Sequence, residues 1–332
     1  MQSVKFRHSV YLLLAALFWG TTFVAQSMAM ETLQPFTYNA CRFLLGTVVV
    51  LPMAILTGRS DSRSVNFRGN TVSGKNAAPV SGVSADGPAV LPPRDRILML
   101  LKGGLMCGTF LFIAGGFQQV GIVYTTAGKS GFITALYIVL VPVFGLFLHK
   151  KCSPLIIVSI ALAVAGLYLL CIREGFSVNR GDVITLGSAV SFAFHILTVD
   201  RYSPRVSGVQ LSCLQFLTAG LLSLIPAFVL ETPQIGIILR AWGPIAYAGV
   251  LSCGVAYTLQ ILGQRGLNPS LAALIMSLES CISALAGWIV LGDSLCAKEL
   301  SGCVLMFTAI ILAQLPSPAR TSGALHRRRT TA

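Results

Sequence analysis

The residues best suited to chemistry are a few polar side chains inside long apolar segments. The stretch ALIMSLESCISALAGWIVLG, from Ala273 to Gly292, carries Glu279 among apolar and small neighbours, with no basic residue within a helical turn. In a helix that begins near residue 270, Glu279 lies about 14 Å below the membrane surface, close to the midplane. An ionisable group there costs at least ~2.5–3.5 kcal/mol, so it must face the protein interior or a wet cavity. Such a carboxyl can carry a proton or contact a substrate; the alternative is a hydrogen bond between helices.

Further polar and aromatic side chains inside the apolar segments could line the same cavity. His195 is the only histidine within an expected membrane span. It could relay protons or contact a substrate, or it could pack as a hydrogen-bonded core residue. Arg42 could bind an anionic group of a substrate, or extend to the nearer membrane surface. The other candidates for the cavity wall are Trp19, Gln118, Thr134, Tyr137, Tyr257, Gln260 and Ser283.

Motifs of enzymes and metal sites are missing from the sequence. The segment TTAGKSGF contains Gly-Lys-Ser, but a phosphate-binding loop needs a glycine at position 123, where a valine stands. No H-E-x-x-H or G-x-S-x-G occurs. The nine cysteines form no C-x-x-C pair, and most lie in apolar runs, as buried thiols do. We therefore expect no enzymatic activity, no cofactor and no metal site.

The composition predicts an all-α membrane protein that crosses the bilayer many times. Of the 332 residues, 55% are hydrophobic and only 11% are charged, whereas soluble proteins have roughly 25% charged residues. Apolar runs long enough to cross ~30 Å of hydrocarbon recur along the chain, and none shows the alternation of a β-barrel. We expect ten spans, at residues 10–30, 36–57, 97–119, 126–148, 154–172, 183–200, 208–230, 241–263, 270–291 and 298–316.

Two segments are expected to be disordered. Residues 58–95 are rich in Gly, Ser, Asn and Pro without apolar periodicity, which is typical of a linker. The basic tail at 317–332 should be disordered as well. The expected domains are then a five-span unit at 10–172, which contains the linker, and a second five-span unit at 183–316.

The positions of Lys and Arg predict the orientation in the membrane. With a cytoplasmic N-terminus, seventeen of these residues lie in cytoplasmic loops and tails, and only Arg173, Arg180, Arg240 and Lys298 lie in outer loops. This asymmetry follows the positive-inside rule, so both termini should be cytoplasmic. The net charge of +13 is explained in this way and does not indicate a nucleic-acid partner.

The chain also repeats itself. A shift of 142 residues places Gln118 on Gln260 and Leu136 on Leu278, and it also sets Tyr137 in the position of Glu279. The earlier spans match with a shift of about 173, which places Trp19 on Phe192. Because each half has an odd number of spans, the halves must have opposite orientations. Inverted repeats are typical of secondary transporters, which bind substrates near the midplane between the repeats.

The chain resembles the EamA family of the drug/metabolite transporter superfamily, as two repeats. The resemblance rests on LFWGTTFVAQ, CRFLLG, GGFQQVGIVYTTAGKSGFITALYIVLVPVFGLFLHKK, SLESCISALAGWIVLGDSL and ELSGCVLMFTAIILA. It implies ten helices around a central cavity in the bacterial inner membrane. Leu278 and Glu279 match the family's Leu-Glu-Pro, Ser280 replaces its proline, and Asp293 replaces its usual second glutamate.

Together these features predict a transporter of small metabolites that works by alternating access. The resemblance implies export of amino-acid-like or drug-like compounds, often coupled to protons. Glu279 is the first candidate for a proton carrier and His195 the second. Uptake or exchange is the alternative, since inverted repeats fix no direction, and a membrane scaffold or an embedded enzyme is the alternative from another class. The expected partners are a small-molecule substrate, protons and the lipid bilayer.

Overall fold

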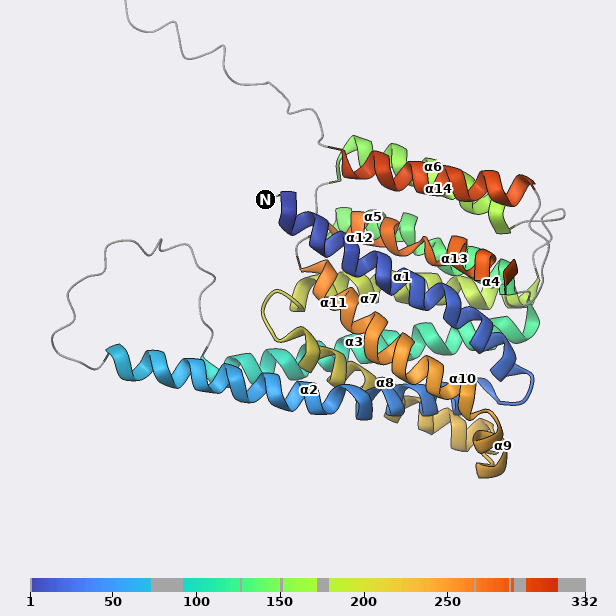
Figure 1. The fold of residues 1–332 in the computed structure, drawn as a ribbon. Helices are drawn as coiled ribbons and strands as arrows, with labels where there is room; N and C mark the ends of the chain where they lie inside the picture. The colour runs from blue at the N-terminus through green and yellow to red at the C-terminus, as the bar shows by residue number, and fades with distance from the viewer. Residues whose placement is uncertain are drawn as a thin grey trace, which may run out of the picture.

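The computed structural model describes residues 2–72, 92–125, 127–149, 152–171, 179–265, 267–286, 288–289 and 297–315. These ranges are helical and contain no strand, and the long helices run alongside one another in a bundle (Figure 1). The first half contains α1 (Gln2–Met30), α2 (Pro35–Val72), α3 (Pro93–Tyr124), α4 (Ala127–Ala135), α5 (Tyr137–Phe147) and α6 (Pro154–Cys171). The second half contains α7 (Arg180–Tyr202), α8 (Gly208–Leu230), α9 (Ile235–Arg240), α10 (Trp242–Tyr247), the π-helix η1 (Ala248–Tyr257), α11 (Thr258–Gln264), α12 (Pro269–Met276), α13 (Glu279–Ala286) and α14 (Ala297–Gln314).

The lengths and composition of these helices suit a membrane. Nine helical segments of the described chain are long and apolar enough to cross a bilayer, and a shorter apolar helix runs over Pro154–Leu169. Their outer surfaces carry large apolar side chains, such as Phe147, Phe228 and Ile311, which are 77%, 70% and 65% exposed. Such surfaces are stable against lipid, which offers no hydrogen bonds, while each helix satisfies its own backbone. The predicted all-α membrane fold is confirmed.

The two halves make equivalent contacts. α3 of the first half packs along α7 of the second. Their equivalents do the same, because the span formed by η1 and α11, which corresponds to α3, packs along α1, which corresponds to α7. α4 and α5 contact α7, as α12 and α13 contact α1. α3 also packs along α8, as η1 packs along α2, and the interfaces of α2 with α8 and of α6 with α14 each join two equivalent spans. Exchange of the halves therefore reproduces the pattern of helix packing, as expected for the two repeats.

The fourth and ninth spans are both interrupted, at equivalent points. α4 gives way to α5 at Leu136, and α12 gives way to α13 at Ser277 and Leu278. At each break the backbone tightens to a bond between residues three apart, from the Leu136 amide to the Ile133 carbonyl (3.2 Å) and from the Leu278 amide to the Ile275 carbonyl (3.3 Å). Tight turns of this kind inside a helix often mark hinges.

No proline is needed for the break in the ninth span. Position 280, where the resemblance to the EamA family implies a proline, is a serine in this chain. One turn earlier, the Ser277 hydroxyl donates to the Leu274 carbonyl at 2.8 Å. A side-chain bond of this type competes with the helical backbone and bends helices, so it contributes to the interruption.

The helices on either side extend into the segment expected as a disordered linker. α2 continues as a helix to Val72 and α3 begins at Pro93, so helix covers both ends of the predicted range 58–95. An established helix propagates with one backbone bond per added residue, and Ser, Arg and Asn near its end do not forbid this. Residues 73–91 and the predicted tail at 317–332 lie outside the described residues.

Two carboxylates tie the halves together at one end of the bundle. Glu231, directly after α8, accepts bonds from the Phe36 amide (2.8 Å), the Thr37 amide (2.7 Å) and the Thr37 hydroxyl (2.7 Å). It thereby satisfies the free amides at the start of α2. Similarly, Asp182 at the start of α7 accepts a bond of 2.5 Å from the Thr125 hydroxyl at the end of α3. These bonds fix the ends of helices that surround the cavity described below.

Replacement of Gly166 by alanine should destabilise the pairing of α6 with α14. A Cβ at Gly166 would lie 2.7 Å from the Gly302 carbonyl oxygen and 2.9 Å from Met306. Overpacking of this kind typically costs about 1–3 kcal/mol, so the purified Gly166→Ala protein should unfold at a lower temperature. Gly131→Ala is the matched control, because a Cβ there meets nothing within 4 Å. Equal melting temperatures for the two variants would contradict this packing.

Candidate functional site

A cavity lies between the two halves, with an empty volume of about 500 Å³ that includes space open to solvent. Seven spans contribute to its wall, from α1, α2, α3, the α4–α5 pair, α7, η1 with α11, and the α12–α13 pair. It is lined by Trp19, Thr22, Phe23, Gln26, Arg42, Gln118, Thr134, Tyr137, Phe192, Ile196, Ser252, Tyr257, Gln260, Met276 and Glu279. Eight of these fifteen side chains are polar or charged and seven are apolar or aromatic, so the wall can contact both the polar and the apolar parts of a small molecule.

Most of the cavity wall consists of pairs of residues that the repeat makes equivalent. A shift of 142 residues relates Gln118 to Gln260, Thr134 to Met276 and Tyr137 to Glu279, and all six line the cavity. A shift of 173 relates Trp19 to Phe192 and Phe23 to Ile196, and these four line it too. The same positions of the two repeats therefore face one another across a shared space.

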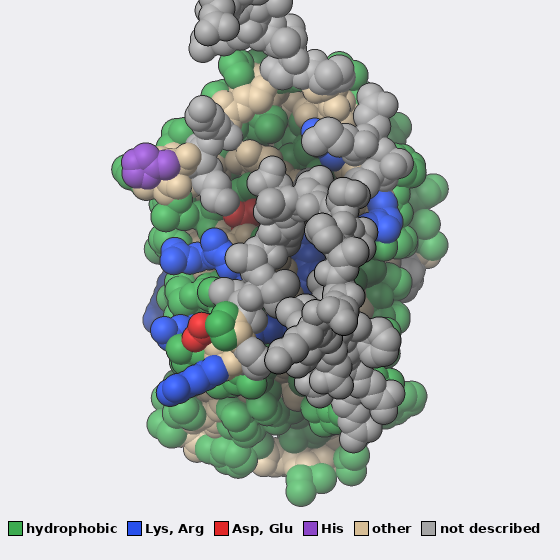
Figure 2. Space-filling model, turned by 90° about the vertical axis from the view of Figure 1, so that its left-hand side faces the viewer, with side chains coloured by type: hydrophobic (Ala, Val, Ile, Leu, Met, Phe, Trp, Pro, Cys, Tyr) green, Lys and Arg blue, Asp and Glu red, His purple; other side chains and the backbone are tan. Residues whose placement is uncertain are grey.

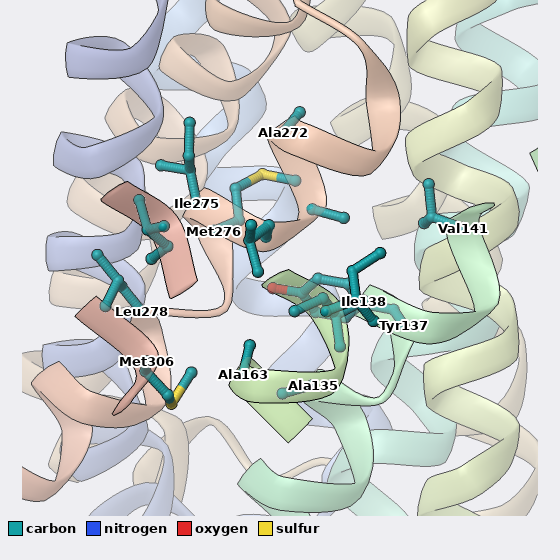
Figure 3. Close-up of a cluster of buried hydrophobic side chains, with 14 of the residues drawn as sticks. Ala135, Tyr137, Ile138, Val141, Ala163, Ala272, Ile275, Met276, Leu278 and Met306 are labelled. Atoms are coloured by element: carbon teal, nitrogen blue, oxygen red, sulfur yellow. The ribbon is translucent and has the colours of Figure 1, made fainter. Parts of the chain in front are cut away.

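Tyr137 and Glu279 are in direct contact. The Tyr137 hydroxyl donates to Oε1 of Glu279 at 3.1 Å, and the two side chains are only 4% and 6% exposed. Each residue is the first of the helix that follows its break, so the two interruptions bring these side chains together. Figure 3 shows Tyr137 directed from α5 toward Met276, among Ile138 and other apolar side chains. The bond therefore joins the two broken spans on the cavity wall, next to an apolar cluster of the core.

Aromatic rings form another part of the wall. The Tyr257 ring packs edge-on against Trp19, with ring centres 4.7 Å apart, and against Phe216, at 5.7 Å. Tyr257 is the last residue of η1, which also supplies Ser252 to the wall. π-helical turns occur often at functional sites, because the wider turn redirects side chains. The cavity thus offers flat apolar surfaces together with polar groups.

Two of the predicted cavity residues are not on the wall. His195 is fully buried behind it, where its Nε2 lies 3.0 Å from Oε1 of Gln215 and its ring packs edge-on against Tyr257. Its neighbours on α7, Phe192 and Ile196, face the cavity, because one residue along a helix turns a side chain by about 100°. Ser283 also lies outside the wall, one turn beyond Glu279 on α13.

Several polar atoms on the cavity wall have no hydrogen-bond partner among the described residues. They are the indole nitrogen of Trp19, Oε1 of Gln26, Nε and Nη2 of Arg42, and Oε1 of Gln260. Buried polar groups without partners are rare in folded proteins and call for a water or a ligand. Within the described ranges, no cluster of three or more His, Cys, Asp and Glu side chains could hold a metal ion. The unpaired atoms on the wall can therefore bond to a water or to a ligand in the cavity.

Some lining residues were not predicted from the sequence: Phe23, Phe192, Ile196, Ser252 and Met276. They are apolar or small, so nothing in their type separates them from the lipid-facing residues around them. The repeat did contain the signal, because Phe192 is the equivalent of Trp19 and Met276 is the equivalent of Thr134. For each predicted lining residue, the equivalent residue of the other repeat was therefore a further candidate for the cavity wall.

Comparison with known proteins identifies the family. The model of the EamA-like transporter family matches twice, over residues 8–172 and 179–315. An uncharacterized transporter of Archaeoglobus fulgidus is 28% identical over 305 residues, which covers 92% of this chain and 84% of that protein. The uncharacterized transporter YwfM of Bacillus subtilis is 24% identical over 324 residues, which covers 96% of this chain and 98% of YwfM.

A solved protein structure shows the same fold. It superposes with a TM-score of 0.70 and 17% identity, and the match covers 93% of this chain and 98% of that one. The two family matches together span nearly all of the helical bundle, and they agree with the resemblance found in the sequence. The chain therefore belongs to the EamA-like transporter family, as a membrane transporter that crosses the bilayer many times.

Proposed function

We propose that the protein is a secondary transporter that exports small amino-acid-like or drug-like metabolites, coupled to protons, by alternating access. The observation that carries this proposal is the bond between Tyr137 and Glu279 on the wall of the cavity. It places the intramembrane carboxyl at the junction of the two repeats, where a ligand or a proton can change its contacts. A group in this position can respond to both cargo and proton.

The equivalent helix breaks support alternating access. In inverted-repeat transporters, discontinuous helices surround the substrate site and one repeat rocks against the other. In this protein α5 and α13 both begin at the cavity, with Tyr137 and Glu279 as their first residues. A ligand biases such a two-state equilibrium only by binding the two states differently. Loss or formation of the bond between Tyr137 and Glu279 provides such a difference.

Glu279 is the proposed proton carrier. Movement of a charged carboxylate within the membrane interior is costly, so binding of a proton or of a cationic group of the cargo makes the rearrangement easier. His195 is the second candidate, although it is buried behind Tyr257 and bonded to Gln215. Tyr257 packs against both the His195 ring and the Trp19 ring, so it connects this histidine with the cavity.

We propose a bacterial inner-membrane location, with the N-terminus in the cytoplasm. The end of the bundle where α1 begins carries basic side chains, seen in blue in Figure 2. The exposed cations near this end include Lys5, Arg7, Arg201, Arg205 and Arg265. The opposite helix ends carry Arg180, Arg240 and Lys298 among the described residues. The positive-inside rule then assigns the more basic end to the cytoplasm.

Glu279→Gln should uncouple transport from the proton gradient, because an amide cannot take up and release a proton. Purified protein in liposomes would be given radiolabelled leucine, radiolabelled phenylalanine or ethidium, with pH gradients of either sign. We expect gradient-driven accumulation of a transported probe to fall to the level of protein-free liposomes. Exchange of that probe without a gradient should persist.

Glu31→Gln is the matched control for this experiment, since Glu31 is exposed after α1 and undergoes the same chemical change. It should transport like the wild type. Accumulation by Glu279→Gln that still follows the pH gradient at the wild-type rate would refute the carrier role. If the pH gradient drives the wild-type protein to move the probe only in the inward direction, the result favours uptake over export. Absence of flux for every probe would favour a scaffold.

Labelling of single cysteines should establish the orientation. Arg205→Cys and Arg240→Cys, each in a background without the natural cysteines, place exposed thiols at opposite ends of the bundle. With a membrane-impermeant maleimide on intact bacterial cells, Arg240→Cys should be labelled at once. Arg205→Cys should react only after the membrane is permeabilised. The reverse pattern would show that the termini lie outside the cytoplasm.

A further inference from the structure

Arg42 is a buried cation in the middle of the bundle. It lies on α2 with only 2% of its surface exposed, and its side chain lines the cavity. Its side chain does not extend to the nearer membrane surface, which was the alternative that the sequence left open. Its guanidinium packs over the Phe43 ring, 4.6 Å from the ring centre, and over Tyr38, at 5.4 Å.

The guanidinium lacks a counter-ion. No described carboxylate forms an ion pair with Arg42, and its Nε and Nη2 donate no hydrogen bond. The one carboxylate on the cavity wall, Glu279, is bonded to Tyr137. Aromatic faces attract a cation, but they offer no acceptor for the N–H groups. Buried charges are normally paired because an unpaired one is expensive, so this site is incomplete without an anion.

The neighbourhood of Arg42 contains further free polar groups. Both amide atoms of Asn39, one turn earlier on α2, have no partner among the described residues. A Cβ at Gly115 would lie 3.1 Å from Nη2 of Arg42 and 3.6 Å from Nδ2 of Asn39, so the backbone of α3 directly adjoins this cluster. The cluster presents several N–H donors in one place.

The repeat shows that Arg42 breaks the symmetry of the cavity. Its equivalent in the second half is Gln215, which is fully buried and bonded to His195. The equivalent of Gly115 is Tyr257. In the first half a glycine thus leaves room for the longer arginine, and in the second half a tyrosine fills the corresponding space. The exchange gives one side of the cavity a positive charge that the other side lacks.

We infer that Arg42 binds a carboxylate or another oxyanion of the transported molecule. The planar guanidinium has N–H donors in a fork that matches the two oxygens of such a group. Trp19, Phe192 and Tyr257 on the same wall would contact an apolar or aromatic body. This inference rests on the proposed transport function and defines its substrate class as small organic anions or zwitterions with an apolar part.

Binding measured through Trp19 tests this inference. The chain has three tryptophans, and two of them, Trp242 and Trp288, are 69% and 51% exposed. Trp242→Phe with Trp288→Phe therefore leaves Trp19 on the cavity wall as the sole reporter. The probes are phenylpropionate, its neutral analogue phenylpropionamide, and phenylethyl phosphate, titrated against the full-length reporter protein in detergent. The carboxylate and phosphate arms distinguish which oxyanion the site prefers.

We expect at least one anionic probe to bind roughly tenfold or more tightly than the amide, as charge-assisted hydrogen bonds predict. Arg42→Gln should remove this preference and leave amide binding close to that of the reporter protein. Arg42→Lys should keep part of the preference, since it retains the charge but not the fork. Arg240→Gln, which removes an exposed cation, should change nothing.

Three results would overturn the inference. They are equal binding of anion and amide to the reporter, an anion preference that persists in Arg42→Gln, and no response of Trp19 to any of the three probes. If Arg42→Gln fails to fold, the comparison of anion with amide on the reporter and on Arg42→Lys decides alone. Transport measured in liposomes distinguishes failure of this inference from failure of the proposed function. Flux of a probe without any preference for anions would contradict the anion site at Arg42 but would leave the transport function standing.

Discussion

A carboxyl group in the membrane interior must be accommodated before the rest of the bundle can be stable. Glu279 meets this constraint through a bond from the Tyr137 hydroxyl, and both residues are nearly buried. The bond needs the two side chains at one depth, which the inverted repeat supplies, and at the same point in space, which the two helix breaks supply. The position of the cavity follows, because the equivalent residues of both halves surround this junction.

The symmetry of the packing and the asymmetry of the chemistry have separate roles. Equivalent helix contacts give the halves two similar surfaces, as the proposed rocking of one half against the other requires. The differences concern the cavity, where Glu279 faces Tyr137 and where Arg42 lines the wall although its equivalent, Gln215, is bonded to His195 behind it. A symmetric scaffold with an asymmetric lining can bind a molecule with distinct ends. In the second half, Tyr257 takes the position of Gly115, beside which Arg42 lies in the first half.

Sequence patterns predicted the helical class, the repeat and the equivalence of Tyr137 with Glu279, because periodicity and spacing do not depend on the details of packing. They could not predict that these two side chains touch, since this depends on breaks that no proline marks in the ninth span. His195 was expected on the wall, but a rotation of one residue along α7 turns it toward Gln215. The sequence allowed the Arg42 side chain to point either to the cavity or to the membrane surface. The packing of α2 against α3 directs it to the cavity.

Cysteine accessibility along α3 and α11 tests most directly whether equivalent residues share one wet cavity. Gln118 and Gln260 line it, whereas Gln119 and Gln264, which are also buried, do not. In a background without natural cysteines, Gln118→Cys and Gln260→Cys should react with a small cationic thiosulfonate several-fold faster than Gln119→Cys and Gln264→Cys. Equal rates at all four positions, or reaction at only one of the two lining positions, would contradict a shared cavity between the repeats.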